Sequence, residues 1–351
     1  MDKWFLNNLV CPRDHLKLSE VGNLLVCKNG HTYHVVDEIP IMLLDDLPQT
    51  MHVAEASIKR AKGILIDERA PQLYLESLGI SEEGKNGIVH LSTHNKSTID
   101  PVVSFLVAAA GGRTYEHLVG KLDSYPIPSL ELPNSNGCTF LDIGCNWGRW
   151  CIAAEYRGYA AVGADPSLGA IMAAKRVSQQ LGLSIKYVVA DGRYLPFRND
   201  AFDNVFSYSV LQHLERDNVK LVLSDISRIL KPHGISLIQL PTVFGLLCLY
   251  HQAKRLFRKA RNFEVRYWSV PSLRRLFSTY FGKSEITAEG YFGIGLQPSN
   301  FKLMPFKIKL VFVCSEILKR ASRLIKPLVY IADSVYIKSL YSKPKRLNKS
   351  T

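Results

Sequence analysis

Three acidic residues in the middle of the chain could bind a ligand. Asp142 lies in the apolar run 139–143, Asp165 follows the run 160–164, and Asp191 follows the run 185–190. Each acid therefore lies at the end of an expected strand, where parallel sheets bind their ligands. A ligand bound at this edge of the sheet could therefore reach all three acids.

A turn with two glycines follows the first of these acids. Gly144 and Gly148 would let a nucleotide-like ligand approach the backbone, although glycines alone would also fit a turn that needs them only for its geometry. Asp142 beside the turn would repel a diphosphate and suits a ligand that bears an amine. Asn146 stands between the glycines, and asparagine tolerates a left-handed backbone better than other non-glycine residues. We therefore expect the turn to form around a nucleotide-like ligand with an amine.

Alternating strands and helices position these residues. Apolar runs between Cys138 and Pro241 predict strands at 139–143, 160–164, 185–190, 204–208 and 235–240. Helical periodicity predicts helices at 147–157, 168–181 and 218–230. This alternation indicates an α/β fold with a mostly parallel sheet, right-handed crossovers and helices on both faces.

Four successive motifs in this region resemble class I S-adenosylmethionine-dependent methyltransferases, especially the ubiquinone/menaquinone-like group of methyltransferase type 11. They are the glycine turn, Asp165 after the second strand, Asp191-Gly192 with Leu195-Pro196-Phe197, and the stretch 202–214 followed by 228–234. The resemblance spans 141–239. It implies a Rossmann-like fold with a seven-stranded, mostly parallel sheet and S-adenosylmethionine as the cofactor.

The resemblance also implies roles in the first turn. Asp142 and Gly144 would hold the methionine end of the cofactor, with Asn146 and Gly148 in the same turn. Asp165 would accept hydrogen bonds from the ribose hydroxyls. A glycine is commoner in the family where this chain has Asn146.

Further roles follow for the later strands. Asp191 would bind the adenine amine, with Gly192 behind the ring. Ser207 and Ser209 would line the floor under the sulfonium. Together these residues complete the expected cofactor site.

Two residues just past the fourth strand are the candidates for catalysis. Gln212 and His213 lie near the place where the methyl group should point. His213 could act as a base or orient a nucleophile, because methyl transfer needs an aligned acceptor and, for hydroxyl acceptors, a deprotonated one. The alternative is that His213 packs at the start of a helix.

Two Cys-x3-His patterns near the N-terminus could bind a metal. Cys11 with His15, and Cys27 with His31, supply two thiolates and two imidazoles, which is a set that zinc accepts. Residues 9–44 resemble the zinc-ribbon-like module of the tRNA-methyltransferase activator family. That family usually shows Cys-x2-Cys, whereas the second cysteine positions here hold an acid and a glycine. Zinc and a metal-free module held by packing both remain open.

The charge of the chain is concentrated in its last third. The whole chain has a net charge of +13, while residues 250–351 contain 21 Lys and Arg against 5 Asp and Glu, or +16, so that the remainder is −3. The expected helices at 246–261 and 307–326 place apolar residues on one face and Lys and Arg on the other. Such faces fit ordinary solvated helices, an anionic membrane surface or nucleic acid, and the interleaved apolar residues favour lipid over nucleic acid.

Composition and the positions of turn-forming residues suggest the organisation of the chain. The apolar fraction of 47% and the charged fraction of 21% are typical of a folded soluble protein and exclude a disordered or fibrous one. Neither a signal peptide nor a transmembrane helix is expected, which favours the cytoplasm, with peripheral contact at the inner membrane surface as an option. We expect a zinc-ribbon-like β-rich module at 1–48 and a helical connecting or capping region at 49–137. The methyltransferase domain would occupy 138–300 and a basic amphipathic helical tail 301–351.

The resemblance favours an enzyme that transfers a methyl group to a small-molecule, glycan or lipid-linked acceptor. One alternative is an RNA methyltransferase, supported by charge and by the N-terminal module. Another is a non-catalytic activator subunit that retains the cofactor fold. The intact acids Asp142, Asp165 and Asp191 argue against a dead site, and cofactor titration would discriminate further.

Overall fold

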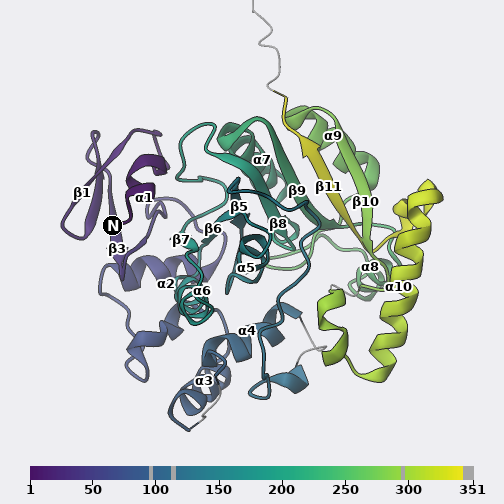
Figure 1. The fold of residues 1–351 in the computed structure, drawn as a ribbon, viewed down its shortest axis with the longest axis horizontal. Helices are drawn as coiled ribbons and strands as arrows, with labels where there is room; N and C mark the ends of the chain where they lie inside the picture. Colours follow the sequence, from purple (N-terminus) through teal and green to yellow (C-terminus); the bar gives the residue numbers. More distant parts are fainter. Residues whose placement is uncertain (95–97, 112–115, 294–296, 343–351) are drawn as a thin grey trace, which may run out of the picture. The chain divides into compact units, whose positions relative to one another are not determined.

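The structure is a computed structural model that describes residues 1–94, 98–111, 116–293 and 297–342. It contains a four-stranded sheet and a seven-stranded sheet, and most of their strands and the helices are labelled in Figure 1. The chain divides into two compact units, the first built mainly from residues up to Arg198 and the second mainly from residues after it.

The N-terminal part of the first unit is a small antiparallel sheet. Helix α1 (Lys3–Asn8) precedes strands β1 (Leu18–Val21), β2 (Leu24–Cys27), β3 (Thr32–Val36) and β4 (Ile39–Pro40). The strands pair in the order β1-β2-β3-β4. This sheet is separate from the large one, so the expected β-rich module is confirmed as a structural element.

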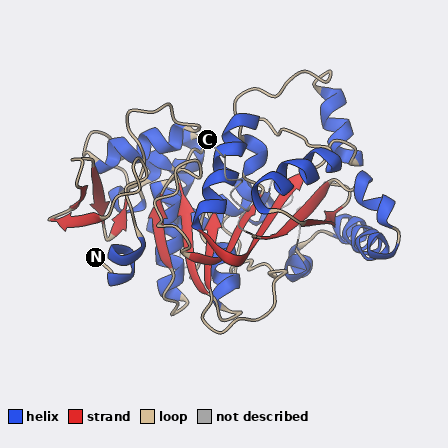
Figure 2. Cartoon of the chain, turned by 90° about the horizontal axis from the view of Figure 1, so that it is seen from above, coloured by secondary structure: helices blue, strands red, loops and turns tan. Residues whose placement is uncertain are grey.

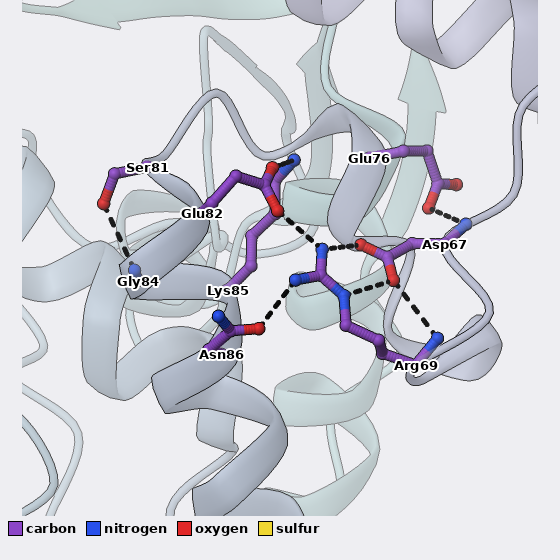
Figure 3. A network of polar contacts seen from close by, with 8 residues as sticks. All are labelled: Asp67, Arg69, Glu76, Ser81, Glu82, Gly84, Lys85 and Asn86. Atoms are coloured by element: carbon purple, nitrogen blue, oxygen red, sulfur yellow. Dashed lines mark hydrogen bonds and ion pairs between the residues drawn. The ribbon is translucent and has the colours of Figure 1, made fainter.

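Helices follow this sheet in the chain, as the sequence predicts. They are α2 (His52–Ala61), α3 (Glu82–His94) and α4 (Pro101–Gly111). Figure 3 shows how Arg69 joins the loop before α3 to the helix itself, because its guanidinium contacts Asp67, Glu82 (2.9 Å) and Asn86 (2.7 Å). These contacts lie on the surface, where ion pairs add little stability.

The first unit also holds the first of the alternating strands and helices. They are β5 (Thr139–Ile143), α5 (Arg149–Glu155), β6 (Ala160–Asp165), α6 (Leu168–Gln180) and β7 (Lys186–Val189). The strands pair in parallel, β5 with β6 and β6 with β7. Nearly every residue of β5 and β6 is buried, as expected for parallel strands covered on both faces. Parallel pairing brings the carboxyl ends of these strands to one edge.

The second unit contributes the remaining strands. They are β8 (Phe202–Tyr208), β9 (Leu230–Pro241), β10 (Ser284–Gly290) and β11 (Ser334–Leu340), with helices α7 (Arg216–Ile229), α8 (Leu246–Lys254), α9 (Val270–Phe281) and α10 (Phe306–Leu324). Strand β8 runs parallel to β9, and β11 pairs antiparallel with both β9 and β10. The seven strands follow the order β10-β11-β9-β8-β5-β6-β7, with helices on either side of them (Figure 2). The predicted Rossmann-like, mostly parallel seven-stranded fold is confirmed.

Two expectations for the basic C-terminal region were wrong. The region 301–351 is not helical throughout, because β11 inserts between β9 and β10 and buries Val335, Tyr336 and Ile337. The helix expected at 246–261 ends at Lys254, since Leu256 and Phe257 adopt positive φ angles and turn the chain. The residues after 342 lie outside the described part of the chain.

Among the described residues, the structure has no helix of the length and apolar character that a membrane crossing requires.

Candidate cofactor site

The glycine turn after β5 uses its own backbone donors. The amide groups of Gly144 and Cys145 donate to the carbonyl of Ala164, at 2.7 and 3.2 Å. The amide of Gly148 donates to Cys145 O at 2.9 Å. A diphosphate would need such donors, as it finds them in dinucleotide-binding turns.

The middle of the turn is fixed by two side chains. Asn146 N–H donates to Asp165 Oδ2 at 2.9 Å, and Trp147 N–H donates to Asn146 Oδ1 at 2.8 Å. Asn146 has a φ of 51°, so the expected left-handed backbone at this position is confirmed. All five successive amide groups from Gly144 to Gly148 therefore have acceptors within the protein, and the turn is a poor receptor for a diphosphate.

Asp142 is a buried carboxyl group beside this turn. Burial raises its pKa to about 7, with Arg149 at the start of α5 acting in the opposite direction. The thiol of Cys151 lies 3.7 Å from Asp142 Oδ2. A buried carboxyl group with so little compensation favours a cationic ligand, because a nearby positive charge would restore its ionised form.

Asp165 at the end of β6 is also buried. Besides Asn146, its carboxylate accepts from Ser167 N–H at 2.9 Å, and burial raises its pKa to about 6. Each carboxylate oxygen thus has one backbone donor and keeps a second lone pair. The group can still accept hydrogen bonds from a ligand's hydroxyls.

Asp191 lies in the loop after β7, and the guanidinium of Arg193 binds its carboxylate in a bidentate ion pair. The guanidinium contacts both carboxylate oxygens, with Nη2 at 2.7 Å from Oδ2 and Nε at 3.1 Å from Oδ1. The amide of Arg193 also donates to Asp191 Oδ1. Arg193 therefore orients the carboxylate beside Gly192, a role that the sequence analysis missed.

Gly148 is required by packing. A Cβ atom there would lie 2.5 Å from Tyr187 Oη and 3.1 Å from the Cβ of Ala174, and its φ is 82°. The hydroxyl of Tyr187 is tied to Ser178 Oγ at 2.8 Å, so it has little freedom to move. This contact accounts for the glycine without a ligand.

In the second unit, the predicted serines occupy the end of β8. Ser207 is fully buried. Ser209 has a positive φ of 60°, and both its amide and its hydroxyl donate to Gln239 Oε1, at 2.9 and 3.0 Å. Gln239 on β9 is thus a fixed part of this strand end.

The candidate catalytic residues are held by a neighbouring loop of the same unit. His213 Nδ1 lies 2.6 Å from Phe263 O, its Nε2 lies 3.2 Å from Gln212 Nε2, and its ring stacks on Phe263 at 3.8 Å. Burial lowers the pKa of His213. The Nδ1–H tautomer satisfies both contacts, with Nε2 accepting from Gln212. This arrangement fits the packing role, and the catalytic role of His213 and Gln212 stays a prediction.

The N-terminal module contains a cluster that could hold a metal. Cys11, Asp14, Cys27 and His31 offer ligand atoms that all lie within 4.8 Å of one another. His31 Nδ1 is 3.4 Å from Cys11 Sγ, 3.3 Å from Cys27 Sγ and 3.2 Å from Asp14 Oδ2. Two thiolates, an imidazole and a carboxylate are a donor set that tetrahedral zinc accepts.

His15, the fourth ligand predicted from the sequence, is outside this cluster. It is exposed and has a positive φ of 58° at the turn after Cys11. The carboxylate of the preceding residue, Asp14, lies in the cluster instead. Asp14 follows Cys11 at the spacing of the second cysteine in a Cys-x2-Cys knuckle. That spacing was the signal that could have identified Asp14.

Comparison with known families gives the class of the central region. Residues 141–238 match the family model of a methyltransferase domain. This part of the chain is a class I, S-adenosylmethionine-dependent methyltransferase domain.

Individual relatives agree over limited lengths. A ubiquinone biosynthesis O-methyltransferase of Brucella anthropi is 33% identical over 103 residues, which cover 29% of this chain and 41% of that protein. The methyltransferase GfsG of Streptomyces halstedii is 30% identical over 144 residues, which cover 39% of this chain and 45% of that protein. The chain therefore spans less than half the length of these relatives.

Among solved structures, phosphoethanolamine N-methyltransferase 2 of Haemonchus contortus in complex with S-adenosylmethionine has a TM-score of 0.41. It is 20% identical, and the match covers 60% of this chain and 50% of that one.

Proposed function

We propose that the protein transfers a methyl group from S-adenosylmethionine to a small-molecule, glycan or lipid-linked acceptor. The observation that carries the proposal is the glycine turn, whose amide donors are all used internally while Asp142 and Asp165 present buried carboxyl groups beside it. S-adenosylmethionine has an ammonium, a sulfonium and ribose hydroxyls, and it has no phosphate. Its ammonium and its ribose hydroxyls donate hydrogen bonds and therefore complement the buried carboxyl groups.

Different residues would bind different parts of the cofactor. Asp142 would bind the ammonium, Asp165 the ribose and Asp191 the adenine amine. Ser207 and Ser209 would lie beneath the sulfonium. The transferred methyl group passes to an acceptor aligned behind it, so that most of the catalysis would come from positioning.

A radiolabelled methyl-transfer assay tests this proposal. The wild-type chain and cofactor are incubated with cell-extract fractions separated into lipid, glycan, small-molecule and RNA pools. We expect label in one of the first three pools. Asp142→Asn should abolish the transfer. The control is Asp203→Asn, which breaks an ion pair with Lys231 near the start of β8, away from the serines at its end, and this variant should retain the transfer. Label in RNA alone would refute the proposed acceptor class, and the absence of transfer to every pool would favour the activator alternative.

The exposed surface of the second unit supports a lipid-linked acceptor. Helix α10 exposes Phe306, Leu310 and Ile317 together with Lys307 and Arg320. The segment around the end of α8 exposes large apolar side chains beside basic ones, namely Leu256, Phe257, Arg258 and Lys259. Apolar residues interleaved with cations complement an anionic bilayer. Peripheral binding to such a membrane is therefore part of the proposal.

Liposome flotation tests this membrane contact. The wild-type chain should float with vesicles that contain an anionic phospholipid and remain below with neutral vesicles, and added salt should weaken the binding. The double variant Phe306→Glu with Leu310→Glu should lose flotation. Leu221→Glu, on an exposed apolar residue of α7, is the matched control and should float. Equal behaviour of the two variants would contradict the proposal.

A further inference from the structure

The N-terminal module contacts the backbone on both sides of the loop that carries Asp191. Before the loop, Ile41 forms a parallel bridge with Val189, and Met42 N–H donates to Val189 O at 2.7 Å. These bonds fix the end of β7. The chain therefore enters the loop from a strand whose last residue is hydrogen-bonded to the module.

After the loop, a second segment of the module pairs with the chain in the opposite direction. Leu9 forms an antiparallel bridge with Phe197. Val10 N–H donates to Pro196 O, and Arg198 N–H donates to Asn8 O, both at 2.9 Å. The exit of the loop is thus fixed as firmly as its entry.

The loop itself makes a third contact with the region after the small sheet. Arg193 Nη2 donates to the carbonyl of Pro48 at 2.9 Å, while the same guanidinium forks onto Asp191. A movement of the backbone at Pro48 would therefore displace the side chain of Arg193 and, with it, the carboxylate of Asp191. The side chains of Arg193 and Asp191 are both largely buried, which limits the screening of their ion pair by solvent.

Buried side chains reinforce the pairing at the exit. Asn8 accepts from Arg198 Nε at 3.1 Å through Oδ1 and donates to Trp4 O at 2.9 Å. The ring of Trp4 meets the fully buried ring of Phe197 edge to face at 6.3 Å. These contacts give the module a specific hold on residues 196–198.

We propose that the N-terminal module is a positioning element of the cofactor site, which holds the Asp191 loop ready for the adenine end of the cofactor. This inference rests on the proposed function of Asp191. A loop fixed at both ends and through Arg193 loses little further freedom when the ligand binds, and such preorganisation strengthens binding. Loosening the hold should weaken cofactor binding while the fold persists.

The experiment compares two full-length variants that each break contacts of the same module. Asn8→Ala combined with Trp4→Leu removes the side-chain hold on residues 196–198. Glu38→Gln breaks the ion pair from the module to Lys175 on α6, at 2.8 Å, which lies outside the loop. Calorimetric titration with S-adenosylhomocysteine measures binding. Amide hydrogen exchange of residues 190–198 in the free protein measures the order of the loop.

We expect the double variant to bind S-adenosylhomocysteine about tenfold more weakly than the wild type. Exchange should be faster in the loop and unchanged in β5 and β6, and Glu38→Gln should match the wild type in both measurements. If the double variant unfolds, Asn8→Ala alone provides the same comparison. Unchanged binding and unchanged loop exchange would overturn the positioning role. A wild-type chain that fails to bind S-adenosylhomocysteine would instead contradict the proposed function.

Discussion

The ionisation of Asp142 would make the proposed cofactor site sensitive to pH. Burial raises its pKa to about 7 and that of Asp165 to about 6, so the cofactor-free protein keeps extra protons on these groups between about pH 4 and pH 7. A carboxyl group whose pKa is raised by folding lowers the stability of the folded state as pH increases through this range. A bound ammonium would favour the ionised form and offset this loss.

Cofactor binding should therefore strengthen as pH rises from 6 to 8, with release of protons. Calorimetric titrations with S-adenosylhomocysteine in two buffers of different ionisation enthalpy measure the affinity and the number of protons released. Ionisation of the ligand itself is subtracted with a reference titration. In Asp165→Asn the component near pH 7 should persist, since Asp142 is intact. An affinity that is constant or falls over this range would show that Asp142 does not ionise on binding.

The metal cluster gives a second prediction for individual residues. The purified wild-type chain should contain about one equivalent of zinc, and Cys27→Ala should lose it. Asp14→Ala should lose it as well, whereas His15→Ala should retain it, because Asp14 lies 3.2 Å from His31 Nδ1 and His15 is outside the cluster. Elemental analysis after exhaustive dialysis provides the measurement. A zinc-free wild type would leave the module held by packing alone, and loss of zinc from His15→Ala only would restore the original ligand set.

At the scale of single elements, the contact between α5 and β7 makes Gly148 a test of packing. Gly148→Ala should lower the free energy of unfolding by about 2–4 kcal/mol, because the new methyl group meets Tyr187 Oη and the φ is positive. Gly137→Ala is the control, since Gly137 has a similar φ of 81° and open space around it. Chemical denaturation compares the two. Equal losses would mean that the backbone conformation alone requires the glycine.

Several elements could be predicted from the sequence, and the reason lies in their burial. Strand β5 matches the predicted 139–143, and α6 begins at the predicted Leu168, because long apolar runs and a serine cap are local signals. Strand β11 could not be foreseen so easily. Its partners β9 and β10 are distant in sequence, and its short alternating pattern follows a long helix. The helix end at Lys254 was missed because positive φ angles at Leu256 and Phe257 are set by the turn itself.

The sequence indicates those candidate site residues that can be recognised from their own type and position. The candidates Asp142, Asp165 and Asp191 follow from their places at or just past the carboxyl ends of strands, and the positive φ of Asn146 follows from the tolerance of asparagine for it. Asp14 was not predicted, although its spacing from Cys11 is a signal that could have identified it. Arg193 was not predicted, because spacing along the chain does not indicate that its side chain turns back onto Asp191.

The whole molecule combines a region that matches a methyltransferase domain with an N-terminal module that contacts one of its loops. Residues 141–238 match a methyltransferase domain, and the contacts at Val189, Pro196 and Arg198 tie the module to this region. The predicted domain boundaries at 48, 137 and 300 stay predictions. What decides the whole account is the identity of the cofactor.

A calorimetric comparison of S-adenosylhomocysteine with NAD tests the identity of the cofactor. The five internally bonded amide groups and the buried Asp142 should admit the first ligand and repel the diphosphate of the second. We therefore predict saturable binding of S-adenosylhomocysteine that is lost in Asp142→Asn, and no binding of NAD. Binding of NAD to the wild-type chain, with S-adenosylhomocysteine failing to bind or to compete, would contradict the account.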